Sequence, residues 1–143
     1  MEFIMILQGK FPQYILSVLL AIVVPILFLP SLSSAQSVSA TVSKQGAQTA
    51  IINIQLANPA PANLIVQMSL PPGNSLASAS PKANKYDKKN NILKWLFKNT
   101  SPGSMHIAVT TQKPLAPERA PVLVRYRDPR SKQITEVRAS SKQ

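Results

Sequence analysis

The sequence has no cysteine and very few acidic residues. Among its 143 residues, five are Asp or Glu and one is His, whereas 16 are Lys or Arg. Without cysteine the chain can form no disulfide, no thiolate metal site and no lipid-modified N-terminal cysteine. The lack of cysteine does not distinguish an oxidising compartment from a reducing one.

The scarcity of acidic residues and histidine argues against an enzyme. After position 35 the acidic residues stand one to a segment, at Asp87, Glu118, Asp128 and Glu136. This spacing supports neither paired-carboxylate chemistry nor a calcium loop. His106 is the only histidine, and strand alternation predicts that it points away from the core, opposite Leu96. No phosphate-binding Gly-rich loop and no G-x-S-x-G motif occurs. We expect no catalytic residue, no metal and no cofactor.

The longest apolar run lies near the N-terminus. Residues 14–29 are apolar apart from one Ser and one Pro, and Lys10 precedes them. Ser33 and Ala35 supply the small residues of a signal-peptidase site, which predicts a signal helix in residues 1–35 and cleavage before Gln36. The run is shorter than the ~20 residues that cross a bilayer, and its retention as a membrane anchor is the alternative. We therefore expect a periplasmic, cell-surface or secreted protein, or else a membrane-anchored one.

Short runs of alternating apolar and polar residues fill the rest of the chain. Gly, Pro, Asn and Asp separate these runs, a pattern typical of a β-sandwich. We predict one all-β domain over residues 36–138, with seven or eight antiparallel strands and a flexible tail at 139–143. The first strand is expected at a sheet edge, residues 82–91 as a polar connection, and residues 113–121 as an extended crossover. The expected strands are 37–43, 49–56, 63–70, 76–80, 92–98, 105–111, 121–127 and 133–138.

The only Trp lies in the clearest predicted hairpin, residues 92–111. Pairing Phe97 with Met105 would set Trp95 opposite Ile107 and place all the large apolar groups on one face. Those groups are Leu93, Trp95, Phe97, Met105, Ile107 and Val109. A lone two-stranded ribbon is marginal in water, so this face is expected to pack against a second sheet.

The last predicted hairpin turns at Asp128-Pro129, because Asp accepts backbone hydrogen bonds in turns and Pro presets φ. Pairing Arg127 with Ile134 sets Arg125 opposite Glu136 and directs all four of these side chains outward. A shift of one residue would bury both arginines, which is costly without partners. The inward residues are then Val124, Tyr126, Thr135 and Val137.

Basic residues gather in two clusters that could bind an anion or a partner. One precedes and includes the Trp95 strand, and the other lies on the last hairpin. The arginines of the second cluster are the better ligands, because guanidinium groups bind carboxylate or phosphate in a bidentate manner. The alternative is a solvated outer face. The candidate residues are Arg125, Arg127, Arg130, Lys132, Lys94 and Lys98. Ile65, Ile92 and Leu96 are apolar residues on outer faces, which either form a partner-binding patch or are covered by a loop.

Five short motifs follow one another along the chain: Asn58–Leu64, Leu70–Gly73, Ser78–Ser80, Leu93–Trp95 and Ser101–Gly103. In the order of these motifs the sequence resembles the conserved-repeat, immunoglobulin-like domains of bacterial and archaeal surface proteins. The resemblance covers residues 52–111, in which prolines stand at 59 and 61 where the family usually carries Gly. It implies an immunoglobulin-like sandwich that serves as a stalk or adhesive module without catalytic residues. The family usually repeats this domain in tandem, and one copy fits here.

Charge and motifs together leave two functional hypotheses. The formal net charge of +11 favours anionic partners. The first hypothesis is an exported, non-catalytic structural or interaction module that binds an envelope or surface protein. The alternative is an extracytoplasmic module that binds an anionic polymer through its basic last hairpin. The lack of exposed stacking aromatics argues against nucleic acid, and membrane contact is expected only through residues 1–35 if they are retained.

Overall fold

The computed structural model describes residues 36–142, so the predicted signal segment 1–35 lies outside the described residues. Within them no helix is long and apolar enough to cross a membrane. The elements of this region are β1 (Val38–Lys44), β2 (Thr49–Leu56), β3 (Asn63–Ser69), β4 (Leu76–Ser80), β5 (Lys85–Asp87), β6 (Ile92–Lys98), β7 (Gly103–Thr111), the 3₁₀ helix η2 (Pro117–Arg119), β8 (Val122–Arg127), β9 (Ile134–Arg138) and β10 (Ser140–Lys142).

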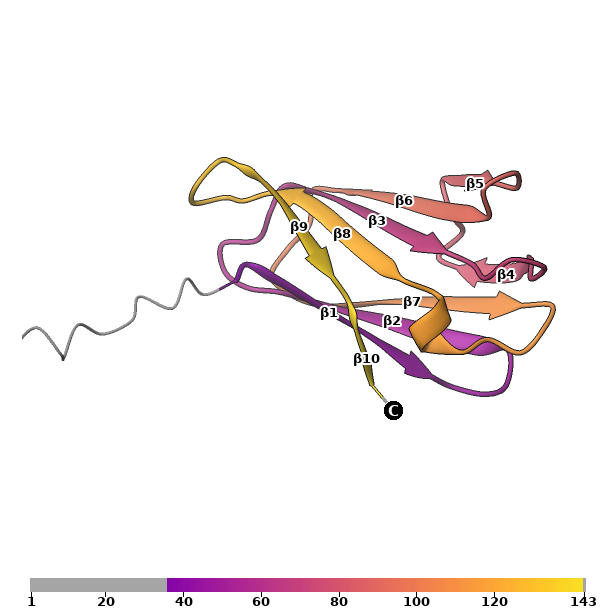
Figure 1. The fold of residues 1–143 in the computed structure, drawn as a ribbon. Helices are drawn as coiled ribbons and strands as arrows, with labels where there is room; N and C mark the ends of the chain where they lie inside the picture. The colour runs from indigo at the N-terminus through magenta and orange to yellow at the C-terminus, as the bar shows by residue number, and fades with distance from the viewer. Residues whose placement is uncertain (1–35, 143) are drawn as a thin grey trace, which may run out of the picture. The chain divides into compact units, whose positions relative to one another are not determined.

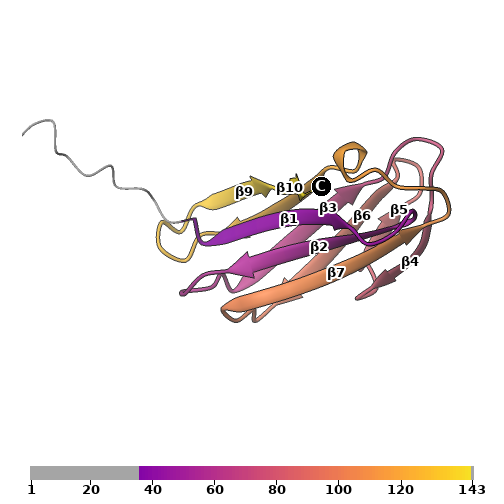
Figure 2. The ribbon, with the colours of Figure 1, turned by 90° about the horizontal axis from the view of Figure 1, so that it is seen from below.

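The strands form two sheets of five, which lie one over the other (Figures 1 and 2). Sheet A has the order β10-β1-β2-β7-β4, and sheet B has the order β5-β6-β3-β8-β9. Neighbouring strands are antiparallel except β1 and β10, which are parallel. The all-β class and the two-layer arrangement predicted from the sequence are confirmed.

A single apolar core lies between the two sheets. Alternate residues of β1, β2, β3 and β8 are buried, as the period-two pattern predicts. The largest fully buried side chains come from both sheets and from the crossover between them: Trp95, Ile52, Ile54, Leu64, Met68, Leu93, Ile107, Leu115, Val38, Val66, Val109 and Val122.

The predicted pairing between the Trp95 strand and the next strand is wrong. β6 pairs with β3 in sheet B, where Trp95 lies opposite Val66. β7 pairs with β2 in sheet A, where Ile107 lies opposite Ile52 and His106 lies opposite Asn53 instead of Leu96. The segment after β6 carries the chain from one sheet to the other instead of closing a hairpin. The predicted inward faces still hold, because either pairing turns the same alternate residues toward the core.

The sequence did not predict the last strand of the described residues. Ser140–Lys142 is a strand, and Thr41 of β1 pairs with Ser140, so residues 140–142 belong to sheet A instead of a flexible tail, and the sheet continues past the domain end predicted at 138. β1 therefore lies between β10 and β2, not at an edge. The predicted polar connection 82–91 contains β5, which raises the number of strands in residues 36–142 to ten. β5 and β10 were not predicted because each has only three residues and none of them is buried, so they carry no alternating apolar pattern.

The crossover from β7 in sheet A to β8 in sheet B contains a buried anchor. Leu115 is 2% exposed, and its backbone N–H donates to the Ala47 carbonyl at 2.8 Å. The prolines predicted an extended connection here, and the structure adds one turn of 3₁₀ helix at Pro117–Arg119. The crossover is thus part of the core and not a loose surface loop.

Candidate binding groove on sheet B

The outer face of sheet B brings apolar and charged side chains into one row. Strand pairing sets Leu96 beside Ile65, Ile65 beside Arg125, and Arg125 beside Glu136. In the next row Lys98 pairs with Asn63. Since these residues alternate with the buried ones, their side chains stand on the face away from the core.

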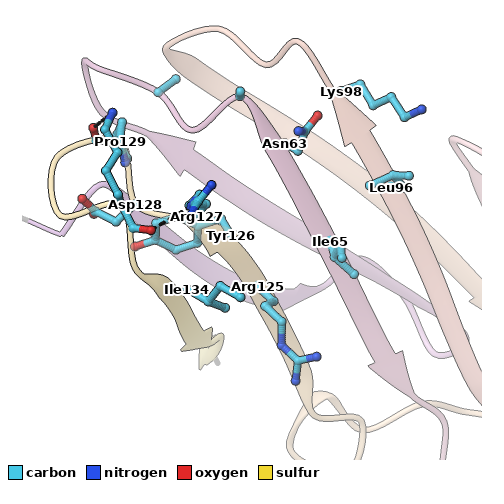
Figure 3. Close-up of a pocket in the computed structure, with 13 residues that line it drawn as sticks. Asn63, Ile65, Leu96, Lys98, Arg125, Tyr126, Arg127, Asp128, Pro129 and Ile134 are labelled. Carbon is cyan, nitrogen blue, oxygen red and sulfur yellow. Dashed lines mark hydrogen bonds between the residues drawn. The ribbon is translucent and has the colours of Figure 1, made fainter.

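An open groove of about 780 Å³ lies on this face (Figure 3). Three large apolar residues of residues 36–142 are exposed, and all three line it: Ile65 at 41%, Leu96 at 42% and Ile134 at 76%. Ala60 and Ala62, from the connection before β3, also line it. Exposed apolar groups that converge on one concavity are a common feature of binding sites.

Four of the six predicted site residues line the groove, and two do not. Those in the groove are Lys98, Arg125, Arg127 and Lys132. Arg130 instead donates through Nη2 to the Asn58 carbonyl at 3.3 Å. Lys94 stands on β6 beside Gln67 and Lys85, outside the groove lining.

The four cations of the groove differ in how far their charge is already engaged. Arg125 donates from Nε and Nη2 to Glu136 Oε2, at 3.1 and 2.7 Å. Both side chains are about half exposed, and such pairs contribute only ~0.2 to 1 kcal/mol to stability. The Lys132 ammonium donates to the Pro129 carbonyl at 2.6 Å. Arg127 donates only through Nε, to the Lys132 carbonyl at 2.8 Å, and the Lys98 ammonium has no hydrogen-bond partner within residues 36–142.

These contacts single out Arg127 and Lys98 as the cations best able to bind a ligand. The Nε bond of Arg127 holds the side chain over the groove and leaves both Nη atoms to donate. A guanidinium held in this way can bind a carboxylate or phosphate with little further ordering. Tyr126 lies beneath, buried, and burial followed by the charge of Asp128 raises the pKa of its hydroxyl.

The register of the last hairpin is confirmed in full. Arg127 pairs with Ile134, Tyr126 with Thr135, and Arg125 with Glu136. The turn forms as predicted, because Asp128 Oδ1 accepts the backbone N–H groups of Arg130 and Ser131, each at 2.8 Å. This turn carries Pro129 and Lys132 to the rim of the groove.

Asp128 also ties the turn to the beginning of the described chain. Its Oδ2 accepts a hydrogen bond from the Ser37 hydroxyl at 2.7 Å, and in Figure 1 the start of β1 lies at the same end as the β8–β9 turn. Hydrogen bonds from the Ser131 N–H, the Ser37 hydroxyl and the Arg130 N–H lower the pKa of Asp128 from 3.8 to about 2. The carboxylate therefore remains charged under all but strongly acidic conditions.

This depressed pKa predicts a loss of stability in acid. A group whose pKa is lower in the folded state stabilises the fold above its unfolded pKa, so the contribution of Asp128 is lost as the pH falls from 3.8 to about 2. We expect Asp128→Asn to reduce the slope of unfolding free energy against pH in this window, measured by urea denaturation. Asp87, whose pKa is lowered chiefly by Asn90, keeps part of the slope. An unchanged slope in Asp128→Asn would contradict the assignment.

The sequence did not indicate the whole groove. Ile65 and Leu96 stood out as outward apolar residues, and both line it, whereas Ile92 is half-buried between β5 and β3 and does not. Ile134 was placed outside by the hairpin register but not joined to the site. Ala60 and Ala62 carried no signal at all, because small apolar residues are common in Pro-rich connections.

The remaining polar features that could carry chemistry in the described residues are a metal cluster and the single histidine. Across residues 36–142, no three His, Cys, Asp or Glu side chains lie together as a metal site requires. His106 is exposed on sheet A and hydrogen-bonds through Nδ1 to Asn53 Oδ1 at 2.6 Å.

Comparison with known proteins finds no matching family model, no match among curated proteins and no match among solved structures.

Proposed function

We propose that this protein is an exported, non-catalytic interaction module of the cell envelope or surface, which binds an anionic partner in the groove on sheet B. The observation that carries the proposal is the convergence of three exposed large apolar residues and four cations on one concave surface. The apolar run and the small residues before Gln36 support export. The partner is an envelope or surface protein with an acidic surface.

Kinship with the conserved-repeat, immunoglobulin-like domains belongs to the same proposal. Its support is the order of turn motifs in residues 52–111 and the two-sheet arrangement of short strands. A module of this kind presents sheet faces and edges to partners and needs no catalytic residues.

The second candidate is a module that binds an anionic polymer through its last hairpin. It is favoured by the number of basic side chains around the β8–β9 turn, where Arg127, Arg130 and Lys132 lie within six residues of one another. Such binding would depend mainly on charge and would weaken steeply with salt.

Replacing two arginines of β8 tests the use of this face. We expect Arg125→Ala with Arg127→Ala to leave the melting temperature nearly unchanged, because both side chains are exposed and the variant loses only one exposed ion pair and one exposed hydrogen bond, from Arg127 to the Lys132 carbonyl. Retention on a heparin column should move to clearly lower salt. The single variants supply the control, since Arg127→Ala should account for most of the change and Arg125→Ala for little. Unaltered retention together with a collapse in stability would show that the arginines are structural.

A further inference from the structure

The floor of the groove has a chemistry that charge alone does not explain. Ile65 and Leu96 are direct cross-strand neighbours at the centre of sheet B, and each remains about 40% exposed. An anionic polysaccharide such as heparin has no aliphatic side chain to cover them. The face therefore combines two exposed aliphatic side chains with positive charge. Such a surface is complementary to a ligand that carries both an apolar group and negative charge.

The cations best able to bind, Lys98 and Arg127, lie in the next outward-facing row to Ile65 and Leu96, on either side of Asn63. Lys98 pairs with Asn63 on one side of β3, and the pairing of Leu64 with Tyr126 brings Arg127 beside Asn63 on the other side. Lys98 and Arg127 are thus two strand spacings apart, about 10 Å at the backbone. The carboxylate that lines the groove, Asp128, accepts hydrogen bonds from its own turn and from Ser37, and within residues 36–142 it forms no ion pair with either cation.

We propose that the occupant of the groove is an extended acidic segment of a partner protein, with a large aliphatic side chain seated on Ile65 and Leu96 and carboxylates bound by Lys98 and Arg127. This inference rests on the proposed function and specifies its ligand. An extended chain advances about 3.3 Å per residue and its side chains alternate in direction, so the residues at i, i+2 and i+4 face the same way. Carboxylates at i and i+4 are about 13 Å apart at the backbone, a span that the long side chains of Lys98 and Arg127 can bridge. The segment therefore carries acidic residues at positions i and i+4 with an aliphatic residue at i+2.

The shape of the site favours a peptide over a membrane surface. Ile65 and Leu96 line a groove of about 780 Å³ together with Lys98 and Arg127. A single extended chain matches such a concave surface better than the flat headgroup layer of a membrane does.

Two dye-labelled peptides test the proposal on protein purified from its own host. One is Gly-Glu-Ser-Leu-Ser-Glu-Gly, and the other has Ser in place of Leu. By fluorescence anisotropy, the leucine peptide should bind at least about fivefold more tightly, because its side chain removes apolar surface from water. Ile65→Ser should abolish this preference while leaving the weaker, charge-dependent binding of the serine peptide. Ile51→Ser is the matched control on the outer face of sheet A, and it should keep the preference.

Each other outcome overturns the inference in a distinguishable way. Equal binding of the two peptides would show that the groove recognises only negative charge. The proposed function would then remain, but the aliphatic residue would not be part of the ligand. Binding to heparin or to vesicles containing phosphatidylglycerol, with no binding of either peptide, would replace the peptide by a polymer or a lipid surface. If no anionic probe binds, the proposed function fails as well. If Ile65→Ser does not fold, Leu96→Ser removes the same floor from the neighbouring strand and gives the same readout.

Discussion

Truncating the single tryptophan to alanine should destabilise the domain by about 3 to 5 kcal/mol, the range found for large aromatic residues in cores. Trp95 is 1% exposed and lies opposite Val66 at the centre of sheet B. Its indole Nε1 donates to the Pro81 carbonyl at 2.9 Å, so the side chain also fixes the segment between β4 and β5. The alanine variant would leave a cavity and remove that hydrogen bond.

Trp95→Phe separates these two contributions. Phenylalanine retains an aromatic ring in the core but has no donor for Pro81, so its cost should be clearly smaller, about 1 to 3 kcal/mol. Urea denaturation of the three proteins measures both differences. A loss below ~1 kcal/mol in Trp95→Ala would place the indole on the surface and contradict the fold.

The burial of Trp95 could be predicted from the sequence, but its neighbours could not. Alternation assigns each strand residue to one of two faces, and this information is local. Which strand lies alongside is decided by the whole core, because pairing β6 with either β3 or β7 buries the same side chains. The predicted hairpin therefore had the correct faces and the wrong partner.

The β8–β9 hairpin could be predicted completely, since its register depends on local chemistry. Asp128 and Pro129 define the turn, and the turn sets every later pair up to Val124 with Val137. A register shifted by one residue would bury two arginines, so burial and turn chemistry select the same pairing. The register could be predicted because the turn residues and the cost of burying the arginines favour the same pairing.

The groove on sheet B could be predicted only in part. Its cations and its outward apolar residues were visible in the sequence, because charge and strand alternation mark them. The sequence did not show which of the basic side chains are free to bind a ligand. Arg125 is engaged by Glu136 across the hairpin, Arg130 donates to the Asn58 carbonyl, and Arg127 is oriented by its hydrogen bond to the Lys132 carbonyl. Such contacts join segments that only the folded chain brings together.

Replacing Leu115 by alanine should destabilise the domain by about 2 to 4 kcal/mol, although the residue lies outside every strand. The sequence shows it between prolines in a connection, where alternation says nothing about burial. In the structure it is 2% exposed, and its N–H donates to the Ala47 carbonyl at 2.8 Å. The alanine variant keeps that backbone hydrogen bond, so its cost reports the lost packing alone.

Leu123→Ala is the matched control for this effect. Leu123 lies on β8, eight residues further along the chain, and its half-buried side chain points to the outer face of sheet B. Removing it leaves no closed cavity, so the expected loss is about 1 kcal/mol or less. A clear excess for Leu115→Ala in urea denaturation would establish that the crossover between the sheets closes the core. Equal costs for the two variants would show that the strands alone close it.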